Sequence, residues 1–263
     1  MYATTYIKAK DVADAVSQLK GADEGKLLAG GQTLIPTLKQ RLTSSDRLID
    51  LTDTGLSGIN DEGSSIRIGA MTRHVEVETS ELVKSTIPAL AALAGGIGDR
   101  QVRNCGTIGG SVANNDPSAC YPSALLALGA TVHTDKRDIA AGDYFTGMFE
   151  TALDEDEVIT AVSFPKPEAA SYVKFPNPAS RYAMVGVFVA KTNSGVAVAV
   201  TGAGQDGVFR HDGLEAALNS SFSADSVDGV AVDDSVLMSD MHASADYRAH
   251  LITQMTKRAV AAC

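Results

Sequence analysis

The pattern of apolar and polar residues in the first part of the chain predicts short strands and helices in alternation. Residues 11–19 place apolar side chains at helical spacing and are followed by a glycine, which predicts a helix. Short apolar runs at 26–29, 47–51 and 65–69 are typical of strands, the last with clean alternation. The small apolar residues of 87–97 predict a buried helix that leads into a glycine-rich stretch.

The next segments predict a further helix and two strands before a proline pair. The helix is expected at 121–128, with Pro122 in its first turn. The strands are expected at 130–134 and 158–164. Pro165-Lys166-Pro167 closes the second strand, so we place a domain boundary there.

Beyond this boundary the pattern is that of an antiparallel sheet followed by a helix. Apolar runs at 171–175, 184–191 and 196–202 predict strands, and residues 192–195 between the last two form a hairpin signal. Residues 246–262 carry apolar side chains on one helical face, which predicts an amphipathic closing helix.

Charge and cysteine content narrow the classes of protein that fit. The formal net charge of −10 argues against nucleic acid or an anionic membrane as a partner. No apolar run approaches membrane-spanning length and the first ten residues contain no apolar signal core, so we expect a cytoplasmic protein without an integral membrane segment. Cys105, Cys120 and Cys263 are too few and too far apart for a disulfide framework, an iron–sulfur site or a zinc site. Any metal is therefore expected in a partner.

Two glycine-rich turns carry the candidate chemistry. The first, Ala29–Pro36, follows a predicted strand with a glycine pair and a polar pair. The second, Arg103–Asp116, crowds three glycines among small polar residues, so its main chain can bend tightly and bring N–H groups close to an anion. One such turn is more often structural than functional. Two of them predict a ligand with two phosphates.

These turns, with the rest of the chain, resemble the FAD-binding medium subunit of the molybdenum hydroxylases, the family of aerobic carbon monoxide dehydrogenase and xanthine dehydrogenase. Ala29–Pro36, and Thr107–Gly110 followed by Asp116-Pro117, are similar to the two FAD signatures of that family. The resemblance extends over almost the whole chain, through Ile68–Thr72, Tyr121–Leu126, Arg137–Ile139, Val158–Pro165, Ala179–Ala183 and Tyr247–Leu251.

The resemblance implies an α+β fold with an FAD-binding domain of the p-cresol methylhydroxylase type. This domain is expected at 1–165, with two α+β subdomains at about 1–54 and 55–165. A smaller C-terminal domain of the carbon monoxide dehydrogenase flavoprotein type is expected at 166–263, with a three-stranded antiparallel sheet and helices.

The resemblance also implies that FAD lies between these parts, with its pyrophosphate against backbone donors of both turns. Ile159 corresponds to an aliphatic side chain packed on the flavin, and Tyr182 to a ring near it. Cys120 stands where many relatives carry an aspartate, which leaves Asp116 as the substitute acceptor, and Lys174 is the lysine nearest a basic position of the family. The expected cofactor-binding residues are Ala29, Gly30, Gly31, Gln32, Thr33, Leu34, Thr107, Ile108, Gly109, Gly110, Ser111, Asp116, Cys120, Ile159, Lys174 and Tyr182. No catalytic residue and no metal ligand is predicted.

Other polar residues favour ordinary structural roles. The five histidines, His74 among them, are scattered and are expected at the surface. The acidic run 154–157 is most simply a solvated turn, with a docking role as the alternative. No nucleophile with an adjacent base is visible.

The favoured function is that of an electron-transfer flavoprotein subunit. The resemblance implies a large molybdopterin-binding partner and a small [2Fe–2S] partner, in a dimer of heterotrimers, with the molybdopterin and the clusters only in those partners. The alternatives are a self-sufficient flavin oxidase or dehydrogenase of the same superfamily, and a nucleotide-binding regulatory protein without redox chemistry. The substrate of the complex (carbon monoxide, an aldehyde or an N-heterocycle) and the terminal acceptor stay open.

Overall fold

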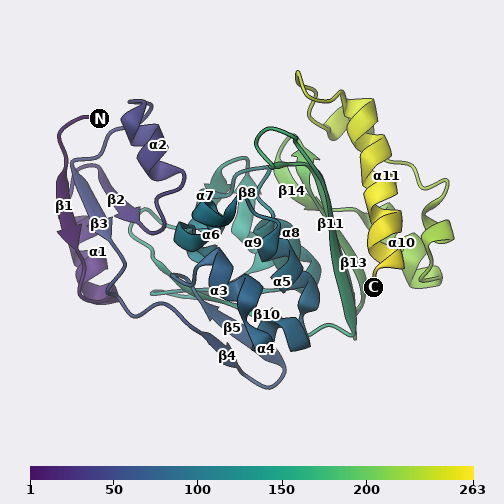
Figure 1. Ribbon diagram of the computed structural model, residues 1–263, viewed down its shortest axis with the longest axis horizontal. Helices are drawn as coiled ribbons and strands as arrows, with labels where there is room; N and C mark the ends of the chain where they lie inside the picture. The colour runs from purple at the N-terminus through teal and green to yellow at the C-terminus, as the bar shows by residue number, and fades with distance from the viewer.

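The computed structural model describes residues 1–263 and builds them around three sheets that follow one another along the chain. In Figure 1 the first sheet lies at one end of the molecule and the C-terminal helix α11 (Ala245–Ala261) at the other. None of the helices combines the length and the hydropathy that a bilayer-spanning segment needs.

The first sheet is small and parallel, with the strand order β1-β3-β2. Its strands are β1 (Thr5–Lys8), β2 (Gly25–Leu28) and β3 (Arg47–Asp50), and its helices are α1 (Val12–Lys20) and α2 (Leu34–Lys39). Helix α1 begins after Asp11, whose side chain accepts a hydrogen bond from the Asp14 N–H. Residues Met71 and Val158, from further along the chain, complete the small core beneath this sheet. The first unit is thus packed against the second along one edge.

The second sheet is antiparallel and has the order β4-β5-β10-β6-β7. Strand β10 lies at its centre although it is the last of the five in sequence, and a long helical segment separates β5 from β6 along the chain. The strands are β4 (Ile59–Asp61), β5 (Ser65–Gly69), β6 (Thr131–Thr134), β7 (Asp138–Ala140) and β10 (Ile159–Pro165). The helices are α3 (His74–Thr79), α4 (Glu81–Thr86), α5 (Pro88–Gly95), α6 (Arg100–Cys105), α7 (Ile108–Asn114), α8 (Tyr121–Leu128) and α9 (Ala141–Tyr144), and a hairpin of β8 (Phe145–Gly147) and β9 (Glu150–Thr151) follows α9.

The third sheet is antiparallel and is covered on both faces. Its strands are β11 (Ala169–Pro176), β12 (Ala183–Thr192), β13 (Gly195–Gly204) and β14 (Gly207–Arg210). The three long strands are those expected, and the short β14 adds a fourth because the chain turns back after Gly204. After it come α10 (Asp212–Ser220), the short 3₁₀ helices η1 (Ala224–Val227) and η2 (Asp234–Val236), and α11.

Alternate residues of β12 belong to two different cores. Val185, Val187 and Val189 pack with α10 and α11, whereas Phe188 and Ala190 join the central core. Figure 1 shows α11 on the outer side of this sheet and α5 and α8 on the inner side. Because both faces are buried, the strand is an unbroken apolar run rather than an alternating one.

Two segments differ from what the pattern predicted. The expected helix at 87–97 is shorter, since α5 ends at Gly95 and a separate helix, α6, follows. The second glycine-rich turn is not a tight bend but the first turn of helix α7. Thr107 caps this helix by accepting the Gly110 N–H at 3.1 Å, which explains why a helix begins among glycines.

Candidate functional site

A cleft of about 580 Å³ lies where the three units meet, within the range typical of small-molecule sites. Both glycine-rich segments line it, together with the loop before β10 and the connection between β11 and β12. The expected site residues all line this cleft except Ile108, whose side chain is fully buried in the central core.

The first glycine turn connects β2 to α2 and packs directly on the second glycine-rich segment. A Cβ atom on Gly30 would lie 2.2 Å from the Cys105 carbonyl oxygen and 2.7 Å from the Gly106 Cα atom. Backbone therefore meets backbone here, and only glycine permits the contact. This contact brings the two segments, distant in sequence, to the same wall of the cleft.

The backbone N–H groups of the first turn have no partner within the protein. None of the four N–H groups of Gly30, Gly31, Gln32 and Thr33 donates a hydrogen bond to another residue. Backbone donors in folded proteins are almost always paired, with water or a ligand if not with protein. A row of four free donors on a cleft wall fits an anionic ligand.

The second segment contributes fewer donors than the sequence suggested. The N–H groups of Ile108 and Gly109 donate to Thr72 and Ala70 at 3.0 and 2.8 Å, and that of Ser111 donates to Thr107 at 3.1 Å. The Gly110 N–H is occupied by the Thr107 cap. Within Thr107–Ser111 only the Thr107 N–H is free, so hydroxyl groups must supply other contacts from this side. Gly109 is needed for packing, since a Cβ atom there would lie 2.6 Å from the Ala70 Cβ.

The cleft has an apolar wall next to a polar one. Ile159 and Val158, at the start of β10, are buried side chains that line it. Tyr182, half-exposed on the β11–β12 connection, also lines the cleft. Burial and the neighbouring Asp116 raise the pKa of Tyr182, and burial also raises the pKa of Asp116. A flat, apolar ring with a polar edge fits such a pair of surfaces.

Arg181 and Lys174 are two positively charged residues that line the cleft close to Tyr182 in the sequence or the sheet. Arg181 has φ +64°, a conformation uncommon outside glycine, and its N–H donates to the Asn177 carbonyl at 2.8 Å. Lys174 Nζ lies 2.6 Å from the Gly96 carbonyl oxygen, 3.0 Å from that of Arg181 and 3.6 Å from Cys120 Sγ. The lysine therefore ties the β11–β12 connection to the helical unit.

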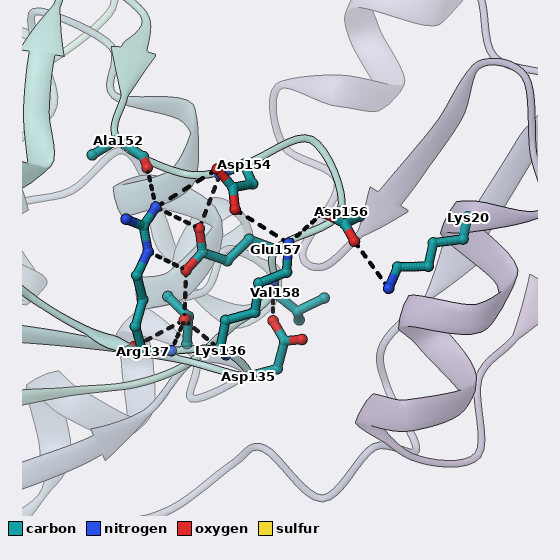
Figure 2. A network of polar contacts seen from close by, with 10 residues as sticks. Lys20, Asp135, Lys136, Arg137, Ala152, Asp154, Asp156, Glu157 and Val158 are labelled. Atoms are coloured by element: carbon teal, nitrogen blue, oxygen red, sulfur yellow. Dashed lines mark hydrogen bonds and ion pairs between the residues drawn. The ribbon is translucent and has the colours of Figure 1, made fainter.

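A charged network holds the loop that leads into β10. Figure 2 shows Arg137 against Glu157 and Lys136 between Asp154 and Asp156. Glu157 accepts from Arg137 Nε at 3.0 Å, from Thr134 Oγ1 at 2.7 Å and from the Asp154 N–H at 2.9 Å. The Arg137 guanidinium lowers the pKa of Glu157 to about 2, so this carboxylate stays ionised.

The same network reaches the first unit and the cleft wall. Lys20 of α1 pairs with Asp156 at 3.1 Å, and Asp135 Oδ1 accepts the Val158 N–H at 2.7 Å (Figure 2). The expectation of a solvated turn is wrong for Glu157, whose side chain is fully buried and lines the cleft. The sequence feature that indicates its burial is that Glu157 directly precedes an apolar segment, Val158 and strand β10.

His74 is a cleft residue that the sequence reasoning missed. It was expected at the surface but is 5% exposed and packs against the ring of Tyr121, with 5.4 Å between ring centroids. Its Nδ1 has no hydrogen-bond partner, and burial together with Arg103 lowers its pKa to about 4. The imidazole is therefore neutral at pH 7. Of the other histidines, His242 and His250 are exposed as expected, and His133 and His211 are half-buried.

Comparisons with known proteins agree with this geometry. Residues 2–167 match the family described as FAD binding domain in molybdopterin dehydrogenase. The chain is 32% identical over 272 residues to the carbon monoxide dehydrogenase medium chain of Afipia carboxidovorans, covering 97% of this chain and 94% of the relative. It is also 32% identical over 273 residues to the nicotine 6-hydroxylase medium subunit of Paenarthrobacter nicotinovorans, covering 98% and 96%.

Solved structures are similar over the full length as well. Reconstituted carbon monoxide dehydrogenase from Oligotropha carboxidovorans matches with a TM-score of 0.92 and 30% identity, over 99% of this chain and 97% of that chain. Quinoline 2-oxidoreductase from Pseudomonas putida 86 has the same fold, with a TM-score of 0.88 at 24% identity.

Proposed function

Because this chain belongs to the family of FAD-binding domains in molybdopterin dehydrogenases, we propose that it is an electron-transfer subunit between the [2Fe–2S] clusters of a partner and an external acceptor. It is an oxidoreductase subunit whose cofactor is FAD. When bound, FAD supplies the redox chemistry, and the protein supplies position and electrostatics.

The observation that carries the proposal is the row of free N–H groups in the first glycine turn. Four backbone donors, from Gly30 to Thr33, belong to residues that line the cleft and lack any partner in the chain. A pyrophosphate provides the acceptors that such donors require. Thr107 of the second segment also has a free N–H and lines the same cleft, and Gly30 of the first turn packs against the adjacent Gly106.

The other cleft residues are assigned roles by their chemistry. Val158 and Ile159 would give an apolar surface for the flavin ring, and Tyr182 would supply an aromatic side chain beside it. Asp116, which lines the cleft with Ser118, would accept hydrogen bonds from hydroxyl groups of the ligand's polyol chain. Its Oδ1 already accepts the Ser118 N–H at 2.8 Å, which fixes the carboxylate in place.

The chain is further proposed to work only within a larger assembly. The relatives are medium subunits of multi-subunit enzymes. We assign this chain one large molybdopterin-binding partner and one small [2Fe–2S] partner, in a dimer of heterotrimers. No three His, Cys, Asp or Glu side chains of this chain come together as a metal site.

The substrate is assigned to the partner as well. Relatives named for carbon monoxide, glyceraldehyde and nicotine match at 32%, 35% and 32% identity, so this chain does not distinguish between them. Equal similarity to relatives that act on different substrates is expected if the chain is an electron-transfer subunit that these enzymes have in common.

Co-expression with the genes that neighbour its own tests the proposal. We expect the chain to elute in size-exclusion chromatography with a large and a small subunit, and the complex to reduce an artificial acceptor when given substrate. The isolated chain should accept electrons from dithionite but oxidise no aldehyde, purine or carbon monoxide. A chain that remains alone and oxidises an organic substrate would contradict the proposal.

A further inference from the structure

Lys174 reaches the cleft as a cation without a carboxylate partner. Its Nζ contacts the Gly96 and Arg181 carbonyl oxygens and the Cys120 thiol. No carboxylate oxygen lies within 4.0 Å of it, since Lys174 takes part in no ion pair. The side chain is held in position by neutral acceptors, and its charge is left uncompensated.

The side chain nearest to this charge at the start of helix α8 is the neutral thiol of Cys120, which cannot balance it. It precedes α8, is 6% exposed, and lines the cleft with its Sγ 3.6 Å from Lys174 Nζ. A carboxylate at this point would form an ion pair with the lysine. The neighbouring hydroxyl of Tyr172 is buried without a hydrogen-bond partner and adds no charge, because burial raises the pKa of Tyr172 well above its ordinary value.

The acidic residues of the cleft do not provide the missing charge. Glu157 is bound to Arg137 by two hydrogen bonds and balances that guanidinium. Asp116 also lines the cleft, but it forms no ion pair with Lys174 or with any other cation. Lys26 and Arg181 also line the cleft and also lack ion pairs. The lysine and arginine side chains that line the cleft therefore outnumber the carboxylates that are not bound to a cation.

A fixed cation stabilises the redox form of a ligand that carries more negative charge. When FAD takes up two electrons and one proton from a reductant, it gains one negative charge. Resting on the function proposed above, we propose that Lys174, left uncompensated by Cys120, makes the cleft bind reduced FAD more tightly than oxidised FAD and so raises the midpoint potential of the cofactor. Lys174 and Cys120 together thus fix a positive charge in the cleft and do not form a second binding site.

Substituting Cys120 separates charge from shape. Cys120→Asp places a carboxylate beside Lys174, and Cys120→Asn places a group of the same shape without charge. We expect Cys120→Asp to lower the affinity for reduced FAD relative to oxidised FAD about tenfold or more, which is a decrease of about 30 mV for a two-electron couple. Cys120→Asn should change this ratio less than about twofold, and Cys120→Ser likewise.

Lys174 provides an independent route if a Cys120 variant fails to fold. Lys174→Met should lower the midpoint potential in the same direction as Cys120→Asp, whereas Lys174→Arg should keep it near the parent value. The potentials are measured on the FAD-loaded full chain by reductive titration with dithionite against a reference dye, and FAD dissociation constants are measured for both redox forms.

The outcomes separate this inference from the proposed function. Lower affinity for both redox forms by the same factor would assign Lys174 to the pyrophosphate and overturn the inference. Unchanged potentials in Cys120→Asp and Lys174→Met would overturn it too, while FAD binding by the parent chain would leave the proposed function intact. A parent chain that binds no FAD would remove both.

Discussion

At the scale of single residues, Gly30 decides whether the two glycine-rich segments can share one wall of the cleft. We expect Gly30→Ala to raise the FAD dissociation constant at least about tenfold, because the added Cβ would lie 2.2 Å from the Cys105 carbonyl and force the segments apart. Titration followed by flavin fluorescence measures the change. Gly142→Ala is the matched control, since a Cβ at Gly142 meets no atom within 4 Å. Equal affinity in both variants would show that the segment contact is not needed for binding.

His74 makes a prediction about pH. Its pKa is about 4 in the folded protein and about 6.5 when unfolded, so the unfolded state binds more protons between these values and stability falls as the pH decreases through this window. Between pH 7 and pH 5 this effect costs about 2 kcal/mol. Urea unfolding at the two pH values should show a smaller loss for His74→Gln than for the parent. The same loss in both proteins would mean that His74 is not buried in its neutral form. The carboxylates Asp156 and Glu157 have folded-state pKa values of about 2 and ordinary values of 3.8 and 4.5, so the stability they contribute is lost mainly below pH 5.

The residues of the cleft differ in how far the sequence identifies them. Gly30 and Gly31 stand in a turn whose composition already points to an anion. The burial and the low pKa of His74 depend on Tyr121 and Arg103. These residues lie beside it only because α3 packs near α6 and α8 in the fold. Contacts of this kind leave no local pattern, so burial of a polar side chain was the feature that sequence reasoning missed.

At the scale of elements, the ion pair between Arg137 and Glu157 sets the course of the loop that enters β10. We expect Arg137→Met to lower the free energy of unfolding by about 1–3 kcal/mol, because it removes two hydrogen bonds from a fully buried carboxylate. It should also weaken FAD binding, since Val158 and Ile159 follow directly. Lys20→Met, which breaks the more exposed pair with Asp156, should cost less than about 1 kcal/mol. Denaturant titration with and without FAD compares the variants, and a larger effect for Lys20→Met would reverse the assigned importance of the two contacts.

The sequence predicted the positions of helices and strands well where one face of the element is exposed. It predicted them less well where contacts with other elements decide where a helix begins or ends. Helix α1 has exposed positions on one side, and strand β5 alternates buried with partly exposed residues, and the pattern located both. The glycines of α7 suggested a bend rather than a helix. The helix begins there because Thr107 caps it and because Ala70 and Thr72 accept hydrogen bonds from its first N–H groups, contacts that no local pattern shows. The break between α5 and α6 likewise has no signal in an evenly apolar segment.

At the scale of the whole molecule, the first unit is the part expected to open most readily. Its core contains six buried residues, compared with 31 in the central core. Amides of β1, β2 and β3 should therefore exchange with solvent faster than those of β12, which is covered on both faces. Addition of FAD should slow exchange in β2 and β3, because the turn after β2 forms one wall of the cleft. Uniform protection of all three sheets, unchanged by FAD, would contradict this description.

The division of the chain into domains at 1–165 and 166–263 stays a prediction, and the packing limits what it can mean. Phe188 and Ala199 of the third sheet belong to the same core as α5 and α8 of the second unit. We therefore expect these two parts to unfold together, even though the chain passes between them near Pro165.

The account depends above all on one FAD bound without a covalent link between the two glycine-rich segments. The full chain, purified with its partners, should carry one flavin per copy, and acid precipitation should release all of it into the supernatant as FAD. Free N–H donors from Gly30 to Thr33 predict this result, because they would hold a pyrophosphate by hydrogen bonds alone. Flavin that stays with the precipitated protein, or a preparation that neither contains nor takes up FAD, would contradict the account.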